Sequence, residues 1–145
     1  MNLQDFISLS EFLLGIPLQP PLVLSPITDL DPDLANIYFT QLNQYSPQAS
    51  FMNSLLAKWT QIQQQPANQW TNLVNTQIMN DPNLGLLARQ IILAWYNGFH
   101  PWFPGQQPTP DPANYERALV WVLAQAHPMG VPLSFGYWQY PPSGA

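Results

Sequence analysis

The stretch that decides the fold is Tyr115 to Pro142, YERALVWVLAQAHPMGVPLSFGYWQYPP, because it joins the most apolar helix pattern to a proline-rich tail that cannot be helical. Residues 119 to 123 are five successive apolar residues, so a helix here would be apolar on all sides. Such a helix must be enclosed, either within its own domain or by another protein. We expect it to end near Ala126, because Pro128 disfavours the helical region at His127 and removes a backbone donor.

The tail after this helix is predicted to be an extended strap. Prolines and glycines interrupt it repeatedly, and it carries the aromatic residues Phe135, Tyr137, Trp138 and Tyr140. Aromatic residues in such segments are most often internal packing, but they also anchor protein interfaces. Two interpretations stay open. The strap either completes the core over the apolar helix, or it docks to a partner through Phe135 and Trp138, with Gly136 allowing close backbone approach.

Helical spacing and helix start signals organise the chain upstream. Residues 3 to 14 place apolar side chains at helical spacing, with Asp5 and Glu11 near the polar side, and Gly15 is positioned to end that helix. Each of the pairs Asp31-Pro32, Ser46-Pro47, Asp81-Pro82 and Asp111-Pro112 suits an N-cap followed by proline at the first helical position. We therefore expect helices over 3–14, 32–45, 47–64 and 82–97, with Gly98 positioned to end the last of these. We also expect one from 112 onwards and a weaker one marked by Trp70, Leu73, Val74 and Ile78.

The predicted fold class is all-α. The chain of 145 residues is expected to form one domain, residues 1–145, as an irregular bundle of five to six helices. Long proline-rich connections at 16–30 and 98–111 join the helices, and residues 127–145 form the extended aromatic tail. The predicted buried faces are Leu34, Ile37, Tyr38, Leu42 and Tyr45, then Phe51, Leu55, Trp59 and Ile62, then Leu84, Leu87, Ala88, Ile91 and Trp95.

The composition is unusually poor in charge. Charged residues make up 8% of the chain, against roughly a quarter in typical domains, so Gln and Asn must supply much of the polar surface. This favours a permanent partner and a neutral, Gln-rich soluble domain about equally. The net charge is −5 and the only cations are Lys58, Arg89 and Arg117, which argues against nucleic-acid binding.

Other function classes are excluded by missing residue types. The chain has no cysteine, so it has no disulfide framework, thiolate zinc site or iron–sulfur ligand. No run approaches the ~18 apolar residues of a membrane span, and no positively charged n-region precedes Lys58. We therefore expect a soluble chain without a readable export signal.

Catalytic signatures are also missing. His100 and His127 lie outside the predicted helices and lack metal-binding spacing, so we expect no metal site. No nucleophile elbow, phosphate loop or dinucleotide fingerprint occurs, so neither catalytic nor cofactor-binding residues are expected. What remains is aromatic: Phe99, Trp102 and Phe103 cluster after the helix predicted over 82–97 and are candidate interface residues, as are His127, Phe135, Gly136, Tyr137 and Trp138 in the tail.

Several blocks of the sequence resemble a known family. They are AWYNG (Ala94 to Gly98), YERALVW (Tyr115 to Trp121), AHPMGVPLSFGYW (Ala126 to Trp138) and the opening FISLSEFLLG (Phe6 to Gly15). These blocks are similar to the small subunit of bacterial membrane-associated, FAD-dependent sugar and polyol dehydrogenases, namely the sorbitol, fructose and glucose dehydrogenase small subunits. Leu14 stands where a threonine is usual in the opening block.

The resemblance implies an accessory role. In that family the small subunit has no cofactor and no catalytic residues, and it binds, stabilises and helps mature a GMC-type catalytic subunit, which holds the FAD. A multi-haem cytochrome c subunit is implied as the electron acceptor. Small subunits of the family commonly bear a twin-arginine leader, so the resemblance implies a periplasmic complex held at the membrane through partners. No such leader is visible in this sequence.

A function of another class competes with this expectation. The exposed aromatic residues would also suit a free-standing carbohydrate-binding or hydrolytic domain. The two hypotheses differ in what the isolated chain should do. An accessory subunit is expected to be unstable alone and to bind no sugar, whereas a carbohydrate-binding domain is expected to be a well-behaved monomer that binds a glycan.

Overall fold

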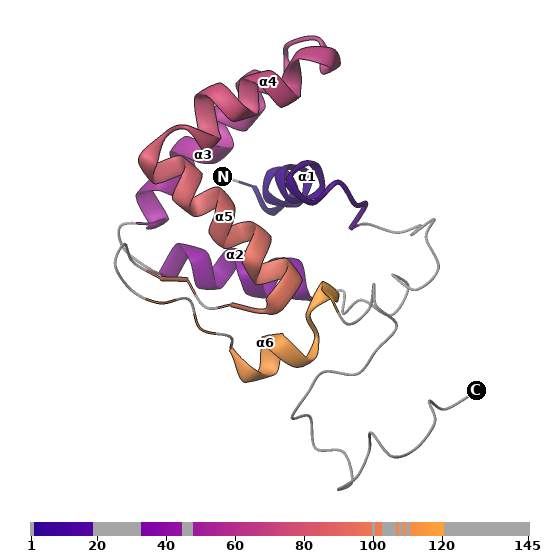
Figure 1. Cartoon of the computed structure of the whole chain (residues 1–145), viewed down its shortest axis with the longest axis vertical. Coiled ribbons are helices and arrows are strands. Elements are labelled where there is room, and N and C mark those ends of the chain that lie inside the picture. The colour runs from indigo at the N-terminus through magenta and orange to yellow at the C-terminus, as the bar shows by residue number, and fades with distance from the viewer. Residues whose placement is uncertain are drawn as a thin grey trace, which may run out of the picture.

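The computed structural model describes residues 2–18, 33–44, 48–99, 101–102, 107, 109 and 111–120. Within these ranges the protein is helical, which confirms the all-α fold class (Figure 1). The helices are α1 (Leu3–Leu14), α2 (Leu34–Gln44), α3 (Gln48–Gln63), α4 (Trp70–Val74), α5 (Pro82–Asn97) and α6 (Pro112–Glu116). A 3₁₀ turn, Ala67–Gln69, precedes α4, and a π-helical turn, Asn75–Met79, follows it.

Local signals set the ends of α1 and α5 as predicted. Gly15 and Gly98 follow the two helices in the left-handed conformation, with φ of 68° and 66°. The carboxylate of Asp81 accepts hydrogen bonds from the backbone N–H groups of Asn83 and Leu84, at 2.9 and 2.8 Å, and so caps α5. Asp111 caps α6 in the same way. The pairs Asp31-Pro32 and Ser46-Pro47 lie outside the described residues.

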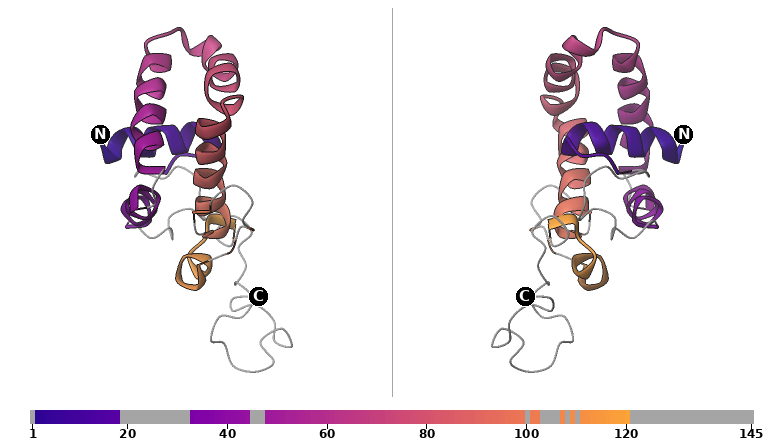
Figure 2. Two further views of the ribbon diagram at one scale, coloured as in Figure 1. Left: turned by 90° about the vertical axis from the view of Figure 1, so that its left-hand side faces the viewer. Right: turned by 90° about the vertical axis from the view of Figure 1, so that its right-hand side faces the viewer.

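A helical hairpin forms the frame of the molecule. One arm is α3, and the other is the run from α4 through the π turn into α5 (Figure 2). Helix α1 crosses this hairpin and contacts α2, α3 and α5. Helix α2 also packs on α3 and α5, while α6 contacts α5. The core therefore lies where α1 and α2 cross the two arms.

The predicted buried faces are largely those that form the core. Eleven of the named residues are buried, namely Leu34, Tyr38, Leu42, Leu55, Trp59, Ile62, Leu84, Leu87, Ala88, Ile91 and Trp95. Ile37 and Phe51 are partly buried against the same cluster, and Tyr45 lies outside the described residues. Trp95 is 1% exposed and meets the Tyr38 ring edge-on at 5.0 Å between centroids. The prediction that Trp95 belongs to the core is confirmed.

The weak fourth helix consists of three kinds of turn. A 3₁₀ turn leads into α4, and the chain then widens into the π turn before α5. The Thr76 hydroxyl donates to the carbonyl of Asn72, four residues earlier on the same exposed surface, at 2.9 Å. At the far side of the π turn, the Met79 carbonyl lies so close to α5 that a Cβ on Gly85 would overlap it. Glycine at this position permits the approach.

The prediction of one continuous helix from Pro112 to about Ala126 is wrong. Helix α6 ends at Glu116, and Arg117 leaves helical geometry with φ −102° and ψ 4°. The backbone N–H of Arg117 bonds to Asn114, three residues back, at 3.1 Å. The Arg117 side chain instead donates from Nε to the Ala113 carbonyl at 3.2 Å. In a continuing helix this carbonyl would accept from the backbone N–H of Arg117. Residues 119 and 120 are helical again, and 121–126 lie outside the described residues.

Candidate functional site

Two of the predicted interface residues lie in the described structure. Phe99 and Trp102 follow α5 and are both half-buried. Gln90, which is 1% exposed on α5, donates its side-chain amide to the carbonyl of Trp102 and so holds this loop against the helix. The other candidates lie outside the described residues: Phe103, His127, Phe135, Gly136, Tyr137 and Trp138. Their roles stay predictions.

Gly98 joins two of the sequence blocks that carry the family resemblance. Its carbonyl accepts a hydrogen bond from the backbone N–H of Asp111 at 2.8 Å. A Cβ at Gly98 would overlap the backbone of Asn114 and Tyr115, so α6 lies directly against the end of α5. The sequence predicted Gly98 only as a helix terminator. Its second role, as the contact point between the blocks, required the tertiary structure.

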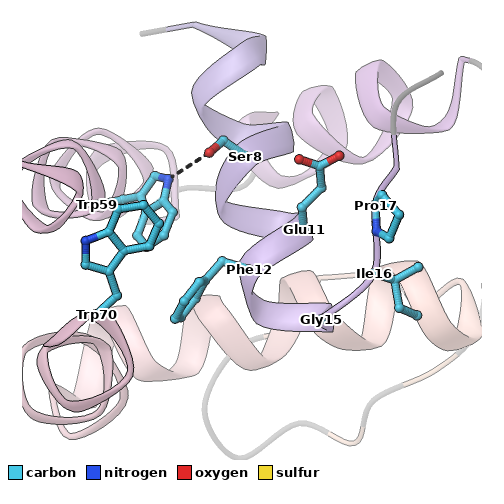
Figure 3. Close-up of a pocket in the computed structure, with 8 residues that line it drawn as sticks. All are labelled: Ser8, Glu11, Phe12, Gly15, Ile16, Pro17, Trp59 and Trp70. Atoms are coloured by element: carbon cyan, nitrogen blue, oxygen red, sulfur yellow. Dashed lines mark hydrogen bonds between the residues drawn. The ribbon is translucent and has the colours of Figure 1, made fainter. Parts of the chain in front are cut away.

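A groove that the sequence analysis did not predict runs along α1. Its floor is formed by Ser8, Glu11, Phe12 and Gly15, which share one helix face because they follow the spacing i, i+3, i+4, i+7. Trp59 and Trp70 form one wall, while Ile16 and Pro17 lie on the other side of α1 (Figure 3). The groove has a volume of about 380 Å³. We call it the α1 groove.

The aromatic rings of the α1 groove come from three helices, with Phe12 on α1, Trp59 on α3 and Trp70 on α4. The ring of Phe12 lies 4.9 Å from that of Trp59 and 6.2 Å from that of Trp70, and the two indoles are 5.5 Å apart, centroid to centroid. Trp59 donates its ring N–H to the Ser8 hydroxyl at 3.3 Å. Trp70 donates its ring N–H to the carbonyl of Gln65 at 2.8 Å. Both indoles are therefore fixed in orientation by a hydrogen bond.

Glu11 is the charged residue among the eight that line the groove. Its Oε1 accepts a hydrogen bond from the backbone N–H of Leu18 at 2.8 Å, and its carbonyl accepts from Gly15 and Ile16. Glu11 thus turns the chain back along the end of α1. From the sequence, Glu11 was predicted only to lie near the polar side of its helix. The helical spacing from Ser8 to Gly15 could have identified the floor of the groove. No signal in the local sequence predicts that Trp59 and Trp70 pack beside it.

The described ranges hold neither a metal-ligand cluster nor a membrane-spanning helix. They contain no group of three or more His, Asp or Glu side chains placed to hold a metal ion. Both histidines, His100 and His127, lie outside these ranges, so the expectation that they form no metal site stays a prediction. None of the described helices combines the length and the apolar character needed to cross a bilayer.

Comparison with known proteins gives one clear assignment. Neither the search of curated proteins nor the search of solved structures found a match. A sequence model of one protein family, described as membrane-bound FAD-containing D-sorbitol dehydrogenase, matches residues 1–137. That match covers nearly the whole chain of 145 residues and confirms the resemblance seen in the sequence blocks. The chain therefore belongs to the membrane-bound FAD-containing D-sorbitol dehydrogenase family.

Proposed function

We propose that this chain is the non-catalytic small subunit of an FAD-dependent dehydrogenase complex that oxidises sorbitol or a related sugar or polyol. The observation that carries the proposal is the family match over residues 1–137. In this proposal a separate GMC-type chain holds the FAD and performs the oxidation. The small subunit binds that chain, stabilises it and assists its maturation.

The α1 groove does not have the chemistry of a flavin site. A flavin dinucleotide carries a negatively charged diphosphate, which proteins bind with backbone N–H groups, helix N-termini and cations. The α1 groove presents the carboxylate of Glu11 and no cation, and it lies toward the C-terminal half of α1. Its residues therefore do not fit FAD. The whole sequence also lacks a G-x-G-x-x-G fingerprint.

The described surface is consistent with a permanent partner. The hairpin end from residue 60 to 80 carries no charged side chain. Its ten Gln and Asn residues are all exposed: Gln61, Gln63, Gln64, Gln65, Asn68, Gln69, Asn72, Asn75, Gln77 and Asn80. Uncharged amides give little protection against association, so such a surface suits a chain that is covered in a complex.

Carbohydrate binding by the isolated chain is the second candidate. The aromatic rings of the α1 groove are of the type on which sugars stack. Sugar hydroxyl groups, however, require both donors and acceptors, and the indole N–H groups of Trp59 and Trp70 are already donated within the protein. This favours the subunit proposal over a free-standing sugar-binding domain.

Co-expression tests the proposal. The chain would be produced alone and together with the GMC-type, FAD-containing subunit of its complex. We expect the pair to copurify, with flavin absorbance and sorbitol oxidation in the flavoprotein, and less soluble flavoprotein when the small chain is omitted. A flavoprotein that folds, binds FAD and reaches full activity without this chain, and does not copurify with it, would refute the proposal. Fractionation of the same cells would test the periplasmic location, and copurified haem would test the cytochrome partner.

A further inference from the structure

We propose that the α1 groove is a docking site for a short segment of the FAD-containing subunit, which presents a lysine or arginine to Glu11 and apolar side chains to Phe12 and Trp70. The inference rests on the proposed function and adds the chemistry of the partner at one surface. It is supported by the hydrogen-bonding groups of the groove, by its length, and by the distribution of cations in the chain.

The aromatic side of the groove has little left to donate. The ring N–H groups of Trp59 and Trp70 are bonded to Ser8 Oγ and the Gln65 carbonyl. The Ser8 hydroxyl accepts both the Trp59 ring N–H and the side-chain amide of Gln63, the latter at 3.0 Å, so its own O–H is the donor that this side of the groove keeps. A ligand that needs donors, such as a phosphate or a carboxylate, therefore finds few here. The rings of Phe12 and Trp70 remain partly exposed and offer apolar surface.

The opposite side of the groove offers an acidic acceptor. The backbone N–H groups of Gly15, Ile16 and Leu18 are donated to Glu11, and Pro17 has none to offer. A carboxylate accepts up to about four hydrogen bonds, and a described bond uses one of these positions on Glu11. Lysine and arginine are donors without acceptors, so they match a site of this kind. Their aliphatic stems pack on apolar and aromatic surface.

The length of the groove indicates a peptide rather than a small ion. Residues 8 to 15, from the middle of α1 to the glycine that caps it, rise by about 10 Å along the helix axis, at 1.5 Å per residue. An extended chain covers that length with about three residues. A segment of this size places side chains of two kinds in the groove at once. Gly15 leaves space for its backbone, since nothing lies within 4 Å of a Cβ built there.

The cation must come from another molecule. The cations of the chain are Lys58, Arg89 and Arg117, all within the described residues, so none of the segments outside them carries a lysine or arginine. A second copy would bring only the same three cations. Two copies would also repel each other, because each carries a net charge of −5. Charge complementarity therefore favours a basic segment of a different protein.

Three substitutions test the proposal in the complex of full chains. Glu11→Gln removes the charge and keeps an oxygen that accepts from Leu18, so the local fold is retained. Gly15→Asn places a side chain in the groove, and asparagine tolerates a positive φ. Asp5→Asn is the matched control, because it removes one negative charge from α1 outside the groove. The affinity for the FAD-containing subunit is measured at low and at high salt, and thermal unfolding confirms that each variant is folded.

We expect Glu11→Gln to weaken the complex about tenfold at low salt, which is 1.4 kcal/mol, and less at high salt, where charges are screened. Gly15→Asn should weaken it at both salt concentrations, and Asp5→Asn should change it less than about twofold. Wild-type affinity for both groove variants would overturn the inference and leave the proposed function intact. A wild-type chain that does not bind the flavoprotein would overturn the proposed function itself. The groove variants could instead abolish a homodimer that the wild-type chain forms, or abolish saturable binding of D-sorbitol by the chain alone. Either result would assign the groove to another occupant and would also overturn the inference.

Discussion

Gly98→Ala is expected to destabilise the protein more than Gly15→Ala, although the two glycines have nearly the same backbone conformation. Gly15 ends α1 with φ 68° and Gly98 ends α5 with φ 66°. An added Cβ therefore meets the same left-handed strain at both positions. Their surroundings differ. A Cβ at Gly15 has nothing within 4 Å, whereas one at Gly98 overlaps the backbone of Asn114 and Tyr115.

The magnitudes follow from these two terms. The left-handed conformation costs a residue with a Cβ roughly 1 to 2 kcal/mol, and this is the whole effect expected for Gly15→Ala. Forcing an extra carbon into a packed site adds roughly 1 to 3 kcal/mol. The free energy of unfolding should therefore fall by roughly 2 to 5 kcal/mol in Gly98→Ala. The difference between the two variants measures how closely α6 approaches the end of α5.

Urea unfolding of both variants provides the measurement. Gly85→Ala completes the set, because it meets the Met79 carbonyl without a positive φ. Alanine gains up to about 1 kcal/mol of helix propensity there, so its net destabilisation should be smaller than that of Gly98→Ala. Equal destabilisation by Gly98→Ala and Gly15→Ala would refute the reasoning. It would mean that α6 does not lie against Gly98, so that Gly98 is not the contact point between the two sequence blocks.

Three further predictions concern the core, the helix caps and the tail. Trp95→Ala should lower the free energy of unfolding by roughly 3 to 5 kcal/mol, because it empties a large site that is 1% exposed; an unchanged thermal midpoint would contradict this. Asp81→Ala and Asp111→Ala should each lower it by about 1 kcal/mol through loss of two capping bonds, whereas Asn at either position should retain most of the stability. Trp138→Ala should weaken the complex with the FAD-containing subunit by about 2 kcal/mol or more if the tail docks there; an unfolded lone subunit with a normally binding folded fraction would instead place the tail in the core.

The elements that the sequence predicted well are those with their own start and stop signals. Helix α5 runs from Pro82 to Asn97, the limits expected from its Asp-Pro cap and terminal glycine. Helix α1 likewise ends at the glycine that was expected to end it. In α5 the apolar spacing also identified the buried face. Such signals act within one or two turns, so the local sequence carries them completely.

The prediction failed where a side chain competes with the helix backbone. Residues 115 to 123 have the spacing of a continuous helix, yet the chain leaves the helix at Arg117. The Arg117 guanidinium takes the Ala113 carbonyl, and Asn114, which is 2% exposed, donates to Gln41 of α2 at 2.9 Å. The second contact joins positions 73 residues apart. Hydrophobic periodicity contains no information on such a bond.

The sequence by itself determined the all-α class, the cores of the helices and their buried faces. Its blocks of aromatic and glycine residues also carried the family resemblance that the match over residues 1–137 confirmed. Only the tertiary structure decided where those pieces meet. The α1 groove exists because α1 crosses the hairpin at Trp59 and Trp70, which are 51 and 62 residues from Ser8 along the chain. Helical periodicity fixes which face of α1 is shared by Ser8 and Glu11, but the crossing depends on how whole helices pack, and that is set by the complete core.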